Sequence, residues 1–499
     1  MSRRKLLSGS AWNFFGQALP LAVAVISIPW LIRLIGLERF GFLALAWTLV
    51  GYASILDLGI GKAVIRTMSG RLARQDTAGA NASGAAGLLF LLGLGITLGL
   101  AILLAAPSLV ERVLKVPPAL QTEALTALRM LALSIPFVML TGGYVGVMSA
   151  HQDFKRMNLI RAQLSLLTYL LPLLLALAGL VALPWLMAAI LLVRGGGTAV
   201  YAWAAKRNHG FQIAWRRPAP DQVQELFKLG GWMTVSNLVG PLLTYVDRLL
   251  MGALVPLRSV GLYAAPYDLL TRLMVVPYSM LSAYFPIASG LKPGSAEGQQ
   301  ALFDVVRWLF VAMFPVVLVV VAFAHPAMTL WLGAEPGPLA GTVLQILIAG
   351  LIFNVMAQGP ATLILAAGHP RNIALLHLVE LPLFIGVLWF LTSRYGIVGT
   401  AASVALRFVL DALAVGALAL HDFAAAPRVR WGQQLALLKP TLLPFVLGVA
   451  LLGLVQFSRS WWMAALTAAV GLAVFAAYAW PRLLRPGERA GLVAFLRRR

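Results

Sequence analysis

The sequence predicts an all-α polytopic membrane protein, and two observations lead to this fold class. First, 60% of the 499 residues are hydrophobic and only 11% are charged, whereas a soluble domain carries about 25% charged residues. Second, apolar runs of about 20 residues, long enough to cross a bilayer core, recur from end to end. Inside a bilayer only helices and closed barrels satisfy the backbone. Because the runs are continuous rather than alternating, we expect helices.

Charged and Pro/Gly-rich breaks divide the chain into about 14 spans. The first apolar run follows Arg3, Arg4 and Lys5, as in a signal peptide, but it is too long for a signal-peptide core and many spans follow it. We therefore expect it to be retained as the first helix. The expected spans, in order, are residues 11–35, 40–66, 84–106, 120–149, 157–180, 184–205, 229–253, 259–287, 303–325, 340–366, 372–393, 397–420, 436–456 and 461–480.

The basic residues indicate how the chain is oriented. With both termini in the cytoplasm, 27 Lys and Arg residues lie on the cytoplasmic side and seven on the outer side, which follows the positive-inside rule. Because the net charge of +22 is spread over short loops rather than one patch, it does not indicate nucleic-acid binding. The remaining five basic residues lie within spans: Arg129, Arg194, Arg248, Arg272 and Arg407.

An internal repeat divides the chain into two halves. At an offset of 220 residues, Trp12 aligns with Trp232 and Gly41 with Gly261. Each half then has six spans, so the two copies keep the same topology, as in transporters with parallel repeats. We expect two pseudo-symmetric six-helix lobes and a C-terminal helix pair. The expected boundaries are 1–208 for the first lobe, 209–228 for a basic cytoplasmic linker, 229–425 for the second lobe, and 426–499 for helices 13 and 14 with a basic tail.

Charged side chains within spans are the candidate functional residues, because each costs about 3 kcal/mol or more to insert. Asp268 with Arg272, and Arg407 with Asp411, are four residues apart, which allows ion pairs along one helix face. Asp247 and Arg248 are adjacent and point about 100° apart. We expect one of them to face a central space and the other to contact a neighbouring helix. Arg194 and Glu380 complete the mid-span set.

Three further features lie outside this set. Asp57, Lys62 and Arg66 are expected toward the cytoplasmic end of the second span, where the basic side chains can also reach lipid headgroups. Gly240 and Pro241 lie below Asp247 and form a candidate hinge. The glycines of GLGITLG (93–99) and GGG (195–197) lack the context of a phosphate loop and predict close helix packing. No His, Asp or Glu group has the spacing of a metal site, and the chain has no cysteine, so we expect no catalytic residue, metal or cofactor.

Two segments carry a family resemblance. The segment GWMTVSNLVGPLLTYVDRLLMGALVPLRSVGLYAAPYDLLTRLMVVPYSMLSAYFP (230–285) resembles spans 7 and 8 of polysaccharide flippases of the Wzx type, the O-antigen flippases of lipopolysaccharide biosynthesis. The segment SAWNFFGQALPLAVAVISIPWLIRLIGLERFGFLALAWTLVGYASILDLGIGKAVIR (10–66), with its Asp-Leu-Gly-x-Gly run, resembles the first two spans of the same family. The family belongs to the multidrug/oligosaccharidyl-lipid/polysaccharide (MOP) exporter superfamily.

The resemblance implies a MATE-like fold of 14 helices. It also implies alternating-access transfer of undecaprenyl-pyrophosphate-linked oligosaccharide across the bacterial inner membrane, for O-antigen, capsule or exopolysaccharide synthesis. The implied partners are the lipid-linked substrate, the membrane, a coupling H⁺ or Na⁺, and a polysaccharide polymerase. A cationic cavity for the pyrophosphate would use Arg194, Arg248, Arg272, Arg407, Lys62 and Arg66. Ion coupling or salt bridges would use Asp57, Asp247, Asp268, Glu380 and Asp411.

Other functions fit the same residues. A cation-coupled multidrug exporter of the superfamily should have an acid-dominated cavity, whereas arginines outnumber acids within these spans. A lipid II-type flippase is another alternative, because its substrate also contains a pyrophosphate. A membrane scaffold for polysaccharide assembly would use the charges only as structural pairs. A membrane-embedded glycosyltransferase would need an exposed loop with clustered acids, which the sequence does not provide.

Overall fold

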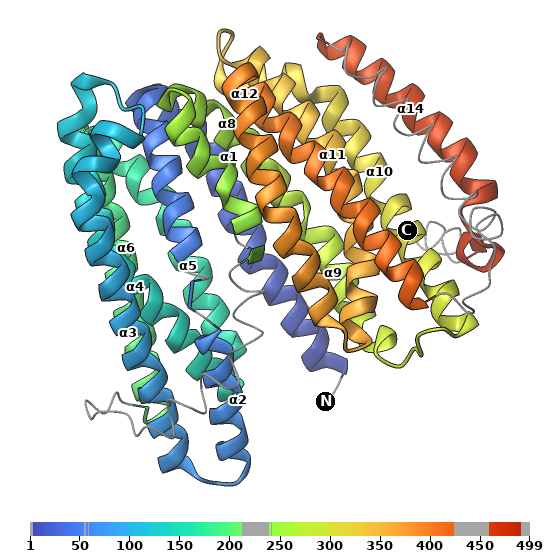
Figure 1. Cartoon of the computed structure of the whole chain (residues 1–499), viewed down its shortest axis with the longest axis horizontal. Helices are drawn as coiled ribbons and strands as arrows, with labels where there is room; N and C mark the ends of the chain where they lie inside the picture. Colours follow the sequence, from blue (N-terminus) through green and yellow to red (C-terminus); the bar gives the residue numbers. More distant parts are fainter. Residues whose placement is uncertain are drawn as a thin grey trace. The chain divides into compact units, whose positions relative to one another are not determined.

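A computed structural model describes residues 3–53, 56–57, 59–211, 239–240, 242–423 and 459–490. Helices joined by short connections make up the regular structure of this part of the chain (Figure 1). Eight helices within it are long and apolar enough to cross a membrane. The predicted fold class is therefore confirmed. The number of spans, about 14, stays a prediction, because the spans expected at 229–253 and 436–456 lie partly or wholly outside the described residues.

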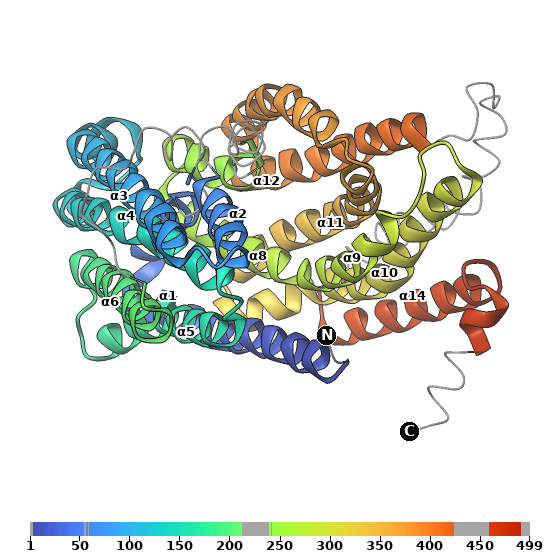
Figure 2. The same cartoon turned by 90° about the horizontal axis from the view of Figure 1, so that it is seen from below.

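The first compact unit comprises Met1–Ala264. Within it α3 packs against α4, α4 against α6, and α1 against α5 (Figures 1 and 2). Residues 242–254 are also helical and belong to this unit. Its labelled elements are α1 (Arg3–Ala53), α2 (Ile60–Ala73), α3 (Thr77–Ser108), η1 (Leu109–Val113), η2 (Pro118–Leu120), α4 (Gln121–Ala150), α5 (Phe154–Leu177) and α6 (Leu183–His209).

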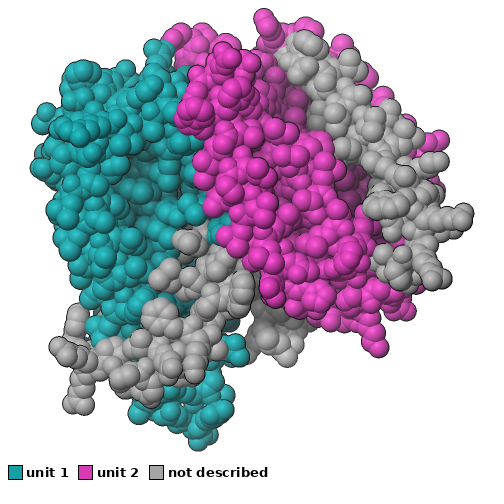
Figure 3. Space-filling view, in the orientation of Figure 1, with its two compact units in different colours: residues 1–264 teal, residues 265–499 magenta. Residues whose placement is uncertain are grey.

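The second compact unit comprises Ala265–Arg499, and the two units are coloured separately in Figure 3. Within it α11 packs against both α10 and α12, and α14 packs against α10. The unit boundary falls inside α8, later than the lobe boundaries expected from the repeat, which stay a prediction. The elements are α8 (Leu257–Leu273), α9 (Val275–Ala288), α10 (Ala296–Leu332), α11 (Gly337–Ala366), α12 (Pro370–Phe423) and α14 (Trp461–Arg482).

Two of these helices are interrupted at a glycine. Gly36 inside α1 has φ 79°, and Gly396 inside α12 has φ 58° and ψ −136°, values that side chains with a Cβ rarely adopt. Both positions coincide with breaks expected between spans. Side chains before Gly396 contact side chains after it. Thr392 and Thr400 lie 2.9 Å apart near the glycine, and His369 and Asp422 lie 3.3 Å apart at the far ends of the two arms. The two arms of α12 therefore run antiparallel as a helical hairpin.

Two expected spans are instead broken into separate helices. The span expected at 40–66 is interrupted between Ala53 and Ile60, and Gly59 there has φ 74°. The span expected at 259–287 divides into α8 and α9. Pro277 explains the second break, because it lacks the N–H that would bond to the carbonyl of Leu273, four residues earlier.

The glycine-rich stretch GLGITLG is a helix-packing surface, as predicted. A Cβ on Gly95 would lie 2.7 Å from the Cα of Pro136, and a Cβ on Gly99 would lie 2.8 Å from the carbonyl oxygen of Ala132. Both neighbours belong to α4, so the glycines allow α3 and α4 to approach closely. In the GGG stretch, Gly197 similarly approaches the side chain of Leu164 on α5.

Candidate functional site

The α12 hairpin brings four ionisable residues together, and we call His377, Glu380, Arg407 and Asp411 the α12 charge cluster. The first two lie on one arm and the other two on the opposite arm. A nitrogen of Arg407 lies 3.5 Å from an oxygen of Glu380, and Nε2 of His377 lies 3.6 Å from an oxygen of Asp411. Arg407 and Asp411 were expected to pair along their helix, but the ion pair of Arg407 crosses the hairpin instead.

The carboxylates of this cluster are buried without full hydrogen bonding. Both oxygens of Glu380 and Oδ1 of Asp411 have no hydrogen-bond partner among the described residues, and neither has Nε of Arg407. The side chains of Glu380 and Asp411 are only 11% and 8% exposed. Buried polar atoms normally find partners, because leaving one unpaired costs about 1–3 kcal/mol. The cluster therefore retains unused capacity to bind a proton or a cation.

A cavity of about 280 Å³ adjoins the cluster. Glu380, Arg407 and Asp411 contribute to its wall, together with Ser403 and apolar residues of both arms. The guanidinium of Arg407 also lies over the rings of Phe384 and Phe408, at 5.2 Å and 4.9 Å from their centroids. Such aromatic faces hold a cation without a hydrogen bond, and the Nε–H of Arg407, which has no hydrogen-bond partner among the described residues, stays available to an anion.

His377, Glu380 and Asp411 form a candidate cation site. One potential ligand atom from each lies within 4.8 Å of the others, and the two carboxylates outnumber the single arginine when His377 is neutral. Carboxylate oxygens suit hard cations, and an imidazole adds a nitrogen ligand. The full set of ligands has no metal-site spacing in the sequence, because the ligands come from two arms of a hairpin. The i,i+3 spacing of His377 and Glu380 was the available signal, and it was missed.

Asp247 and Arg248 are both buried inside the first unit, at 1% and 7% exposure. One carboxylate oxygen of Asp247 accepts a hydrogen bond from the hydroxyl of Tyr263 at 2.6 Å, and the other accepts one from the backbone N–H of Arg248 at 2.8 Å. Arg248 reaches Thr48 on α1 at 3.4 Å and lies over the ring of Tyr245. Both residues therefore contact a neighbouring helix, which was expected of only one of them, and the expectation that the other faces a central space stays a prediction. Their substrate and coupling roles stay predictions.

Asp57 lies at the interruption before α2 and binds backbone groups. Its two carboxylate oxygens accept hydrogen bonds from the N–H groups of Gly59 and Gly61, at 2.9 Å and 3.0 Å. These contacts satisfy donors at the start of a helix, which have no partner within the helix. The Asp-Leu-Gly-x-Gly run is therefore a helix-start motif in this structure, and the carboxylate of Asp57 has a structural task.

The other basic candidates lie in different surroundings. Lys62 and Arg66 are exposed on α2, and their contact with lipid headgroups and their substrate role stay predictions. Arg194 lies on α6, and its Nε is buried with no hydrogen-bond partner among the described residues. Its guanidinium is therefore a candidate ligand for an anion.

The remaining predicted residues lie near the start of the second repeat. Asp268 and Arg272 are half-buried on α8, and their pairing along the helix stays a prediction. Gly240 is helical, and its carbonyl accepts a hydrogen bond from Thr244 at 3.0 Å. Pro241 lies outside the described residues, so the hinge also stays a prediction.

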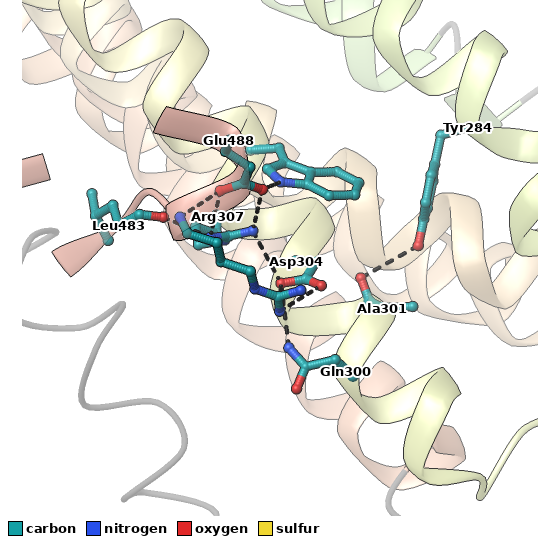
Figure 4. Close-up of polar contacts among 9 residues, drawn as sticks. Tyr284, Gln300, Ala301, Asp304, Arg307, Leu483 and Glu488 are labelled. Carbon is teal, nitrogen blue, oxygen red and sulfur yellow. Dashed lines mark hydrogen bonds and ion pairs between the residues drawn. The ribbon is translucent and has the colours of Figure 1, made fainter. Parts of the chain in front are cut away.

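A second charge cluster anchors the segment after α14 to α10 (Figure 4). Two oxygens of Glu488 accept hydrogen bonds from Arg307, at 2.8 Å and 3.1 Å, and Arg485 donates to Asp304 at 2.6 Å. Burial raises the pKa of Glu488, but hydrogen bonds from the Arg485 N–H, Trp308 and Arg307 outweigh burial and leave that pKa below its ordinary value. The sequence analysis did not identify this anchor, because its partners are about 180 residues apart.

Comparisons with known proteins agree with this architecture. A family described as "Polysaccharide biosynthesis protein" matches residues 6–292. A putative O-antigen transporter of Shigella flexneri is 27% identical over 408 residues, which cover 82% of this chain and 96% of that protein.

Solved structures share the fold at low identity. An inward-facing multidrug resistance MATE family transporter of the MOP superfamily matches with a TM-score of 0.70 and 15% identity, over 84% of this chain and 99% of that one. The lipid II flippase MurJ, in an inward closed conformation, matches with a TM-score of 0.67 and 13% identity, over 96% of this chain and 100% of that one. At such low sequence identities, these comparisons show a shared fold and nothing about the substrate.

Proposed function

The chain belongs to the polysaccharide biosynthesis protein family and has the fold of the MOP superfamily, and from this premise we propose that it is a flippase for a lipid-linked oligosaccharide. The proposed substrate is an undecaprenyl-pyrophosphate-linked oligosaccharide unit. It moves from the inner to the outer leaflet of a bacterial inner membrane by alternating access, and the cytoplasm holds both termini. The S. flexneri relative, described as a putative O-antigen transporter, supports this substrate class.

The α12 charge cluster is the observation that carries the proposal. A pyrophosphate cannot enter a low-dielectric space without positive partners, and arginine binds phosphate oxygens bidentately while staying charged. Arg407 meets this need beside a cavity, yet in this structure Glu380 holds it at 3.5 Å. Glu380 therefore competes with the substrate for the same guanidinium.

Cation binding would resolve this competition. A proton or Na⁺ on Glu380 and Asp411 neutralises the charge that holds Arg407, because the electrostatic attraction between the pair is then reduced. Arg407 becomes available to the pyrophosphate, so cation and substrate favour each other's binding. The lipid-linked substrate and the coupling H⁺ or Na⁺ are thus proposed partners, and a polysaccharide polymerase that consumes the product is a further one.

Transport by purified protein in liposomes tests the proposal. With a fluorescent undecaprenyl-pyrophosphate-linked saccharide, we expect Arg407→Ala to lower the flipping rate about 10-fold or more, because a charge-assisted hydrogen bond contributes about 1.5–3 kcal/mol. Arg394→Ala is the matched control, since Arg394 is exposed on the same hairpin. Normal flipping by Arg407→Ala in well-inserted protein would contradict the proposal.

The same assay separates the alternatives. A cation-coupled multidrug exporter is favoured by one observation, the buried acids Glu380 and Asp411, which would also attract a cationic drug. Such an exporter would move a cationic dye and leave the saccharide lipid in place. A polysaccharide-assembly scaffold would move neither, and its single charge substitutions would lower stability instead. The named relatives are transporters and flippases, so we assign transport rather than catalysis.

A further inference from the structure

A close backbone contact joins two glycines that the internal repeat makes equivalent. A Cβ on Gly41 of α1 would overlap the carbonyl oxygen of Leu257 and lie 3.2 Å from the backbone N of Gly261. A Cβ on Gly261 of α8 would lie 2.8 Å from the carbonyl oxygen of Leu37 and 3.1 Å from the backbone N of Gly41. Both glycines belong to the first compact unit. Only glycine fits at either position.

The contact is reciprocal at the repeat offset. Leu37 and Gly41 move onto Leu257 and Gly261 when the chain is shifted by 220 residues, and each glycine meets the leucine carbonyl of the other copy. The contact is therefore self-complementary, like the interface of a symmetric dimer.

A second contact joins the same two repeats through Lys115, which lies between η1 and η2. Its backbone N–H donates to the carbonyl of Gly252 at 3.0 Å, and its ammonium donates to the carbonyl of Leu254 at 2.7 Å. These carbonyls end the helical residues 242–254, where no further helical N–H is available and the helix dipole attracts a cation. Lys115 thus links a connection of the first repeat to a helix end of the second.

We propose that these contacts form the outer gate of the transporter: Gly41 with Gly261 as its closing surface, and Lys115 with the 252–254 carbonyls as its latch. This inference rests on the proposed function. All the residues involved lie in, or within about three residues of, connections expected on the outer side. The two contacts are made by backbone groups and by one ammonium, so they can part without breaking an ion pair, and water can replace the carbonyls around the ammonium of Lys115.

Distance measurement by electron paramagnetic resonance tests the gate, because the chain has no cysteine to remove. Spin labels on Glu38→Cys and Ser259→Cys in the full-length protein report the separation of the two repeats at this end. We expect a short-distance population in the parent protein. Gly41→Ala should shift most of that population to longer distances, because its Cβ blocks closure. Lys115→Gln should reduce the population at least two-fold without adding bulk.

Two matched controls belong to this experiment. Gly93→Ala adds a Cβ with nothing within 4 Å, and Arg112→Gln removes an exposed charge from the same connection. Both should keep the parent distribution. An unchanged distribution in Gly41→Ala and Lys115→Gln would overturn the gate even if the protein flips lipid. Conversely, gate shifts in a protein that flips no saccharide lipid would leave the gate standing and refute the proposed function.

Discussion

At the scale of single residues, the acidic side chains differ in what binds their carboxylate oxygens. Asp57 and Asp247 each accept two hydrogen bonds from nearby N–H or O–H groups. Glu380 and Asp411 retain oxygens with no hydrogen-bond partner among the described residues. Because a satisfied carboxylate has little to gain from a proton or cation, the coupling role fits Glu380 and Asp411 better than the other two.

A histidine outside the membrane spans gives a prediction at this scale. The ring of His151, just after α4, stacks on that of His209 with centroids 4.3 Å apart. Burial first, and the nearby His209 second, place the pKa of His151 below its ordinary value of 6.5, although Asp153 opposes this shift. Below pH 6.5 the unfolded chain therefore takes up a proton more readily than the folded one, so the stability of the fold decreases as the pH is lowered.

The measurement is thermal unfolding in detergent between pH 7.5 and 5 (from about one unit above to about one and a half units below the ordinary histidine pKa). We expect the Tm of the parent protein to fall on acidification, and the Tm of the His151→Gln variant to fall less. His421→Gln is the control, because that side chain is 86% exposed. If the Tm of His151→Gln decreases by as much as that of the parent protein, the histidine pair does not cause this pH dependence.

At the scale of elements, the α12 hairpin depends on one residue. Gly396 adopts φ 58° and ψ −136°, a conformation nearly restricted to glycine. A Cβ there meets no neighbouring atom within 4 Å, so any penalty of a substitution comes from the backbone itself. The hairpin in turn positions Glu380 opposite Arg407, and its geometry therefore controls the candidate site.

Gly396→Ala should lower stability by about 1–3 kcal/mol, the usual cost of such a backbone conformation. Thermal unfolding gives the value, and the flipping assay should show a parallel loss. Gly416→Ala on the same hairpin has equally free surroundings but an ordinary helical backbone. It should be neutral or slightly stabilising, because alanine favours a helix by about 1 kcal/mol. Equal Tm values for the two variants would argue against backbone strain at Gly396.

The elements also show how far sequence reasoning reaches. Length and hydropathy sufficed to locate the eight described helices that are long and apolar enough to cross a membrane, and the breaks near Gly36 and Gly396 follow from local composition. The interruption before α2 was missed although Asp57 and Gly59 lie in it, because apolar residues flank them on both sides. The pairing of Arg407 with Glu380, and the addition of His377, depend on how two helix arms align about a turn. Spacing along one helix carries no information about that alignment, so the i,i+4 pair was expected instead.

At the scale of the whole molecule, the distribution of Lys and Arg predicts the orientation of every connection. The turn before α5 (Phe154–Leu177) is expected in the cytoplasm, and the turn after it is expected outside. Lys155 and Ala178, at the two ends of this helix, are both exposed. Since no native cysteine interferes, one helix offers a matched pair of reporter positions.

Cysteine labelling tests the orientation. In intact spheroplasts, a membrane-impermeant maleimide should react with Ala178→Cys and should reach Lys155→Cys only after permeabilisation. The positive-inside rule is the physical reason, because basic connections are retained on the cytoplasmic side. The reverse pattern would place both termini outside. It would also move the proposed gate of Gly41, Gly261 and Lys115 to the cytoplasmic face.

The nested contacts of the α12 hairpin have a consequence for biogenesis. Each arm alone would bring charges into the bilayer, at about 3 kcal/mol per charge or more. The partners of Arg407 and Asp411 lie on the arm synthesised just before, so the charges can meet as soon as the turn at Gly396 forms. The hairpin can therefore insert as one partly neutralised unit. The same acids and arginine proposed to operate the transporter would first ease its entry into the membrane.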